Sequence, residues 1–97
     1  MNVGIYKIKI RLPENQTLKG KRSTINSLCH RVRNKFNVSI SVVDNQDTWQ
    51  LATIGISYVS NDTRQTNKVL DHVVTFLQSV RGDIDLVSYE QETLTGF

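Results

Sequence analysis

The side chains best suited to covalent or metal chemistry do not form a recognisable catalytic set. Cys29 and His30 are adjacent in a segment of helical periodicity, so their side chains point about 100° apart and cannot act together as nucleophile and base. His72 is the other histidine, and neither histidine has a partner at a metal-binding spacing. Cys29 is most simply a small core residue. The sequence therefore predicts no catalytic residue, no metal site and no cofactor.

The loop after the first predicted strand argues against the chemistry of small acylphosphatases. Those enzymes have this size and element order, and they need a glycine-rich phosphate loop containing an arginine at this place. Here the loop reads Pro13-Glu14-Asn15-Gln16-Thr17, without glycine. We therefore expect a protein that is not an enzyme.

Charge is distributed very unevenly along the chain. Residues 1–37 hold nine Lys and Arg and one acid, a net charge of +8. Residues 38–97 hold three Lys and Arg and eight acids, a net charge of −5, so the total is +3. Such a split favours a surface that faces a polyanion, although it also serves solubility.

Six of these cations are the candidate contacts to a phosphate backbone. Lys19, Arg22 and Arg33 fall on one flank of a predicted helix, where long basic side chains can follow a line of phosphates. The other three alternate along a predicted strand, and like charges in a row favour a counter-charged partner. These three are Lys7, Lys9 and Arg11. Two alternatives stay open: the helix flank only serves solubility, or the strand cations pair with Glu90 or Glu92.

The aromatic residues do not indicate base-specific recognition of single-stranded RNA. Tyr6 and Tyr58 share the apolar face of their strands, so we expect them in the core, and the glycine- and aromatic-rich signature of RNA-recognition modules is missing. Trp49 follows a predicted turn. It either anchors a partner or closes over the end of the core.

Two strand-helix-strand units must position these residues. Apolar residues alternate with the cations from Tyr6 to Leu12, Thr17 is placed to cap the first helix, and Asn37 is placed to end it in a left-handed conformation. Asp44–Asp47 reads as a hairpin turn, and Gly82 as the stop of the second helix. The expected strands cover about 6–12, 38–42, 50–60 and 85–93, and the expected helices run from about 17 to 35 and from Asp62 to Gly82.

This order predicts one α+β domain over residues 1–97, with an ordered core of about 3–93. The predicted topology is ferredoxin-like (β-α-β-β-α-β), a four-stranded antiparallel sheet with both helices on one face. The helix-covered face should collect Tyr6, Ile8, Ile10, Ile40, Ile54 and Ile56, and the opposite face Lys7, Lys9, Arg11, Ser39, Ser41, Thr53 and Ser57. The last strand allows two registers, with either Val87 and Tyr89 or Leu86 facing the core.

Size and hydropathy indicate a small cytoplasmic protein. A chain of 97 residues has room for one core. No stretch approaches the roughly 18 apolar residues that span a bilayer, and lysines interrupt the first strand too often for a signal peptide. One cysteine cannot form an intramolecular disulfide, which suits a reducing compartment.

An ordered set of short motifs resembles a bacterial family, the YlxP-like proteins (domain of unknown function 503). The resemblance covers roughly residues 3–80, and its motifs are Leu12-Pro13, Thr17-Leu18-Lys19, Lys21-Arg22, Phe36-Asn37-Val38-Ser39, Asp44, Asp47-Thr48-Trp49-Gln50, Ile54-Gly55 and Val59-Ser60-Asn61-Asp62. It implies a ferredoxin-like fold and genes that neighbour those of translation and ribosome maturation, without an established activity. The chain departs from the family pattern at Val42, where glutamate is common, and at Leu51, where a basic residue is common.

Charge and resemblance together predict a non-catalytic, RNA- or ribosome-associated accessory domain. Its expected partner is structured RNA or a ribosomal surface, with no membrane and no small-molecule cofactor involved. The alternative is a homodimeric protein-interaction module that uses the open sheet face or an edge strand.

Overall fold

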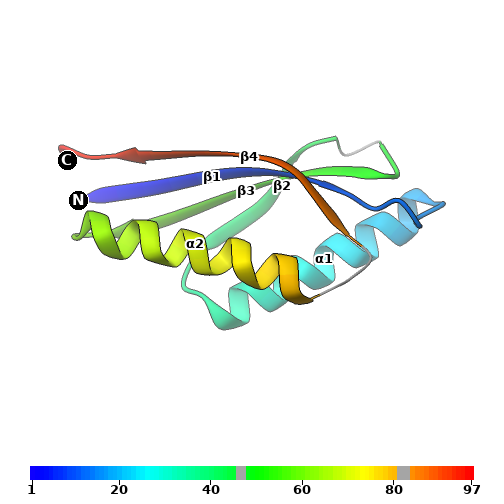
Figure 1. The fold of residues 1–97 in the computed structure, drawn as a ribbon, viewed down its shortest axis with the longest axis horizontal. Helices are drawn as coiled ribbons and strands as arrows, with labels where there is room; N and C mark the ends of the chain where they lie inside the picture. Colours follow the sequence, from blue (N-terminus) through cyan, green and yellow to red (C-terminus); the bar gives the residue numbers. More distant parts are fainter. Residues whose placement is uncertain (46–47, 81–83) are drawn as a thin grey trace.

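The predicted strands and helices form one sheet covered on one side by two helices (Figure 1). The computed structural model describes residues 1–45, 48–80 and 84–97. Its elements are β1 (Asn2–Arg11), α1 (Leu18–Lys35), β2 (Ser39–Asp44), β3 (Leu51–Ser60), α2 (Thr63–Val80) and β4 (Asp85–Leu94). All strand pairs are antiparallel and the strand order is β2-β3-β1-β4. This confirms the predicted ferredoxin-like α+β fold.

The core lies between the sheet and the two helices. All six side chains predicted for the helix-covered face, from Tyr6 to Ile56, are buried. The helices add one apolar stripe each, which consists of Ile25, Leu28, Cys29 and Val32 in α1 and of Leu70, Val73 and Leu77 in α2. Burying a side chain of this size contributes about 1.5–3 kcal/mol, so the alternating pattern strongly favours this register.

The N-terminal end of α1 agrees with the prediction from the sequence, whereas its C-terminal end does not. Thr17 caps α1 as predicted, because its hydroxyl accepts a hydrogen bond from the backbone N–H of Gly20 at 2.9 Å. The expected left-handed Asn37 is wrong. Instead, α1 ends at Lys35, the backbone of the next residue, Phe36, is already extended, and β2 begins three residues later at Ser39. Among the described non-glycine residues, Asn45 has the positive φ, at 59°. Residues 46–47 of the predicted turn and Gly82 lie outside the described residues.

Each edge strand contains one extra residue that interrupts its pairing with the sheet. Lys9 of β1 pairs with Ser88 of β4, and the next residue of β1, Ile10, pairs with Leu86. Val87 is therefore the extra residue of β4. The bulge explains why the alternation of this strand was ambiguous. Leu86 packs against the core, whereas Val87 and Tyr89 are exposed. In β2, Val43 is the corresponding extra residue.

The face of the sheet without helices is mostly polar, as predicted. The register places Lys7, Lys9 and Arg11 there, in line along β1. Thr53 is an exception to the expected exposure, because it is buried on this face. Its hydroxyl donates a hydrogen bond to Oδ1 of Asn45 at 2.6 Å, which ties β3 to the β2–β3 loop.

Candidate nucleic-acid interface

The first helix is the most cationic element of the molecule. Helix α1 contains six Lys and Arg and neither Asp nor Glu: Lys19, Lys21, Arg22, Arg31, Arg33 and Lys35. Five of these side chains are exposed, and Lys21 is buried. The helix therefore presents positive charge that no carboxylate of its own offsets.

One flank of α1 carries the three helix cations that the sequence singled out. Arg22 lines a hollow between α1 and the sheet, together with Asn26, Val42 and Ala52. Arg33 donates a hydrogen bond from Nη2 to the backbone oxygen of Ile40 at 2.8 Å. This bond holds the guanidinium over edge strand β2 and leaves its other N–H groups for a ligand.

The opposite flank holds two further cations, Arg31 and Lys35, which the sequence reasoning missed. Nζ of Lys35 lies 4.7 Å from the ring centroid of Phe76, a cation–π contact that orients Lys35 beside α2. Between the two flanks the exposed side chains are neutral and polar, namely Ser23, Ser27 and Asn34. The signal for this wider surface was readable, because residues 18–35 contain no acid.

Lys21 has a structural role. It is 2% exposed, and its Nζ donates hydrogen bonds to the backbone oxygens of Asn45 at 2.6 Å and Leu51 at 3.1 Å. The ammonium group thus joins α1 to the β2–β3 hairpin and does not contribute to the exposed surface.

The loop at the N-terminus of α1 carries an exposed aromatic side chain. Asn15 Nδ2 donates to the backbone oxygens of Thr17 at 2.6 Å and Trp49 at 2.5 Å, which places Trp49 next to the start of the helix. The indole is 54% exposed, so it does not close over the core. In the first turn of α1, the backbone N–H of Gly20 is already bonded to the hydroxyl of Thr17.

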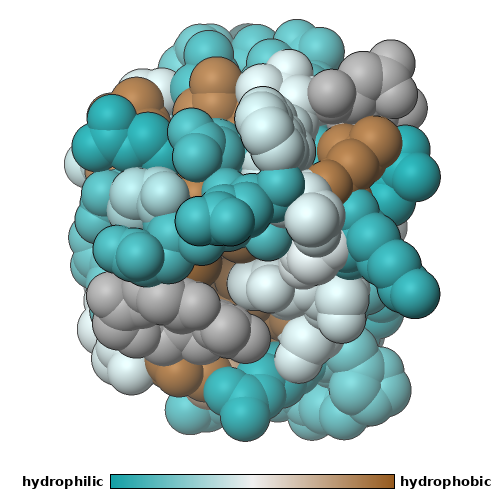
Figure 2. Space-filling view, turned by 90° about the vertical axis from the view of Figure 1, so that its right-hand side faces the viewer, coloured by the Kyte–Doolittle hydropathy of each residue, from teal (hydrophilic) through white to brown (hydrophobic). Residues whose placement is uncertain are grey.

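Figure 2 views the molecule from the end where this loop and the β2–β3 hairpin lie. Hydrophilic residues cover most of this end, and the hydrophobic residues show only as small, separate areas. A surface of this kind suits contact with a hydrated, charged partner better than burial against an apolar one.

The three strand cations lie on the opposite side of the sheet from α1. Along β1 their neighbours on β4 are Glu90 beside Lys7, Ser88 beside Lys9 and Asp85 beside Arg11. Arg11 Nη2 and Asp85 Oδ2 are 3.3 Å apart, and this is the one ion pair whose two partners both lie in the described ranges. The structure therefore does not bring the six predicted contacts into one surface, and it sets acids beside the strand group.

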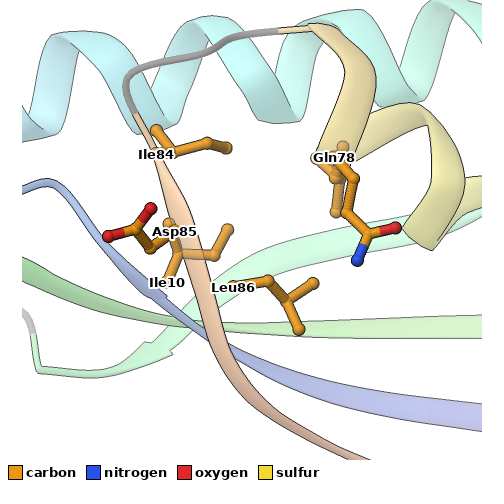
Figure 3. Close-up of a pocket in the computed structure, with 6 residues that line it drawn as sticks. Ile10, Gln78, Ile84, Asp85 and Leu86 are labelled. Carbon is orange, nitrogen blue, oxygen red and sulfur yellow. The ribbon is translucent and has the colours of Figure 1, made fainter.

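A pocket of about 390 Å³ lies between the end of α2 and the start of β4 (Figure 3). Its lining combines apolar and polar side chains, and Asp85 and Gln78 point to opposite sides of it. Asp85 pairs with Arg11, and the amide of Gln78 does not titrate, so these two polar groups do not form an acid–base pair. The lining residues are Ile10, Leu77, Gln78, Ile84, Asp85 and Leu86.

The thiol of Cys29 is free but buried. Burial raises the pKa of the Cys29 thiol, although Arg33 acts in the opposite direction, so the reactive thiolate is disfavoured. Within the described ranges no three His, Cys, Asp or Glu side chains gather as a metal site. Neither described helix has the length and apolarity needed to cross a bilayer.

Fold and surface together define a small α+β domain of ferredoxin-like topology with one strongly basic helix. A solved structure described as "De novo designed protein Foldit4" shares the fold, with a TM-score of 0.55, 15% identity and coverage of 98% of this chain and 99% of that one. Residues 3–91 match the model of the family described as "Protein of unknown function (DUF503)", and the chain belongs to this family. It is 40% identical over 77 residues to "Uncharacterized protein YlxP" of Bacillus subtilis (strain 168), which covers 79% of this chain and 84% of that relative. The resemblance predicted from the motifs is confirmed.

Proposed function

We propose that this protein is a non-catalytic accessory domain that binds the phosphate backbone of structured RNA through the exposed surface of α1. The observation that supports it most is that this helix carries five exposed cations and no acid. Lysines and arginines that neutralise phosphates release condensed counterions, and this release supplies most of the affinity of sequence-independent binding. Ribosomal RNA is one such partner, and a cytoplasmic location belongs to the same proposal.

The arrangement of side chains on α1 fits a phosphate backbone. At 1.5 Å per residue the 18 residues of the helix extend about 27 Å, enough to meet several phosphates. The two basic flanks can contact phosphates on both sides of the helix, while Ser23, Ser27 and Asn34 supply hydrogen bonds between them. The strand cations are secondary in this proposal, because β4 sets Glu90 and Asp85 beside them.

Trp49 extends the proposed interface at the start of the helix. An exposed indole is a platform on which an unpaired base stacks, whatever its identity. Asn15 holds the backbone of Trp49 close to that of Thr17, so this residue lies near the first turn of α1. We therefore favour an RNA hairpin, in which a stem meets α1 and a loop base meets Trp49.

The test measures binding of a labelled RNA hairpin by fluorescence anisotropy over a salt series. We compare Lys19→Gln/Arg31→Gln, which removes one cation from each flank of α1, with Arg64→Gln/Lys68→Gln, which removes two exposed cations from α2. The α1 variant should bind more weakly. Its plot of log affinity against log salt, which has a negative slope, should become less steep by about 2, or about 1 for each lost phosphate contact. Because Trp49 is the single tryptophan, its own fluorescence gives a second, label-free signal.

The outcome is clear in either direction. A loss in the α1 variant alone supports the proposal. Equal losses in both variants, or binding that does not depend on salt, would show that α1 is not the interface.

A further inference from the structure

The open face of the sheet has an exposed apolar end. The register sets Val3 of β1 between Leu94 of β4 and Val59 of β3, and Ile5 follows on the same face of β1. Ile5 is 37%, Leu94 38% and Val59 59% exposed, and both helices lie on the other side of the sheet (Figure 1). Neighbouring apolar side chains left in water often mark an interaction surface.

Beyond this apolar end, the same face carries two adjacent rows of opposite charge. The row on β1 is basic, with Lys7, Lys9 and Arg11. The row on β4 is mainly acidic and pairs with every second residue of β1: Glu92 with Ile5 at the border of the apolar end, then Glu90 with Lys7, Ser88 with Lys9 and Asp85 with Arg11. Lys7 and Glu90 are direct neighbours in the register, yet they form no ion pair within 4 Å in the described part of the chain. Each of these two side chains can therefore form an ion pair with another partner.

These two rows make the face complementary to a copy of itself in one orientation. A two-fold axis parallel to the strands, placed between β1 and β4, lays β1 of one copy over β4 of the other at the same height. Lys7 then faces Glu90 of the second copy, and Val3 faces Leu94. An axis across the strands would instead lay the apolar end over Arg11 and Asp85. The charges therefore favour the parallel axis.

We propose that the open sheet face is a homodimer interface, in which a second copy of this chain stacks face to face about this axis. Aligned sheets pack about 10 Å apart, which suits apolar side chains at one end and long Lys–Glu pairs in the middle. Both helical layers point outward in this dimer, so α1 stays exposed in each copy. The proposal goes beyond RNA binding and does not depend on it.

The first test measures mass by light scattering over a concentration series of the full chain. Wild type should change from monomer to dimer as concentration rises. Leu94→Asp should raise the dimer dissociation constant at least about tenfold, because it places a carboxylate in the apolar contact. Thr75→Asp is the matched control, since it adds the same charge at an exposed site on α2 and should leave the constant unchanged. A wild type that stays monomeric throughout would overturn the proposal.

The second test uses charge reversal to fix the orientation. The double variant Lys7→Glu/Glu90→Lys keeps opposite charges facing each other in its own dimers, but it meets wild type with like charges. Native mass spectrometry of an equal mixture should show both homodimers and fewer mixed dimers than random exchange gives. Random mixing would contradict the interface, because the two rows would then not face each other. Circular dichroism of each variant alone checks that it is folded.

Discussion

Helices α1 and α2 are both 18 residues long and lie on the same face of the same sheet, yet their surfaces differ. Helix α2 carries Arg64, Lys68 and Asp71, a nearly balanced set. Helix α1 carries six cations and no acid. Since either composition can accompany an apolar stripe that packs on this sheet, the charge of α1 is not required by the fold. We therefore propose that α2 serves packing and that α1 also serves an external partner.

The largest effect should come from the attachment of α1 to the hairpin. Lys21→Met keeps the length of the side chain but leaves the carbonyls of Asn45 and Leu51 without their charged donor. We expect the free energy of unfolding to fall by about 3 kcal/mol, measured by urea denaturation. Lys19→Met, at an exposed position of the same helix, should change it by less than about 0.5 kcal/mol. Equal effects would mean that the buried ammonium is not what joins α1 to the sheet.

The attachment of α2 depends on close approach to β1 at Gly4. A Cβ added there would lie 2.7 Å from Cδ1 of Leu70 and closer still to Cγ2 of Thr66. Gly4→Ala should therefore lower the free energy of unfolding by about 2 kcal/mol in the same measurement.

Gly20→Ala in α1 provides the comparison for this second prediction. Its Cβ would lie 2.6 Å from Oδ1 of Asn15 and 2.9 Å from Oγ1 of Thr17, but alanine favours the helix by about 1 kcal/mol, so the net change in the free energy of unfolding should be near zero. If Gly4→Ala left the free energy of unfolding unchanged, α2 would be packed more loosely on β1 than its contacts suggest.

A smaller effect should follow from the hydroxyl of Tyr6, which lies 3.1 Å from Oδ1 of Asp71 on α2 and 2.9 Å from Oε1 of Gln91 on β4. Tyr6→Phe should cost about 1 kcal/mol. Burial, together with Asp71, raises the pKa of Tyr6 to about 12 from 10.0. Because the folded pKa is the higher one, this contribution is complete below pH 10.0 and is lost as the pH rises toward about 12.

Absorbance of the phenolate follows this ionisation directly. One of the three tyrosines should ionise late, and that step should be missing in Tyr6→Phe. A titration curve that is the same in shape for both proteins would contradict the raised pKa.

The smallest effect should come from the surface charges themselves. Lys19→Gln/Arg31→Gln and Arg64→Gln/Lys68→Gln should each change the free energy of unfolding by less than about 0.5 kcal/mol, because all four side chains are exposed. Chemical denaturation of the two variants tests this. A clear loss of stability in Lys19→Gln/Arg31→Gln would mean that the cations of α1 stabilise the fold. The contrast between the two helices would then disappear.

The fold was predictable because its signals are local and repeated. Alternation in β1 and the spacing of Ile25, Leu28 and Val32 each specify one buried face, and four antiparallel strands leave few ways to combine them. The register of β4 was not predictable, since one extra residue, Val87, changes the alternation within the strand. Asn37 failed as a helix end because the backbone is already extended one residue earlier, at Phe36.

The candidate interface was predictable only in part. The cations were visible, and the topology already implied that strand and helix groups face opposite sides of the sheet. Lys21 sits at helical spacing from Ile25 and Leu28, so its burial was readable, but its two carbonyl partners depend on the hairpin. The bond from Arg33 to Ile40 and the exposure of Trp49 likewise come from tertiary contacts that no spacing encodes.

The extra valines of the two edge strands bear on how the protein avoids aggregation. An unbroken edge strand is a template onto which further chains add and grow into fibrils. Val43 and Val87 interrupt that template on both edges, and Arg33 caps one backbone oxygen of β2. Deleting either valine should restore a regular edge, and the shortened chain should then form fibrils more readily than the parent.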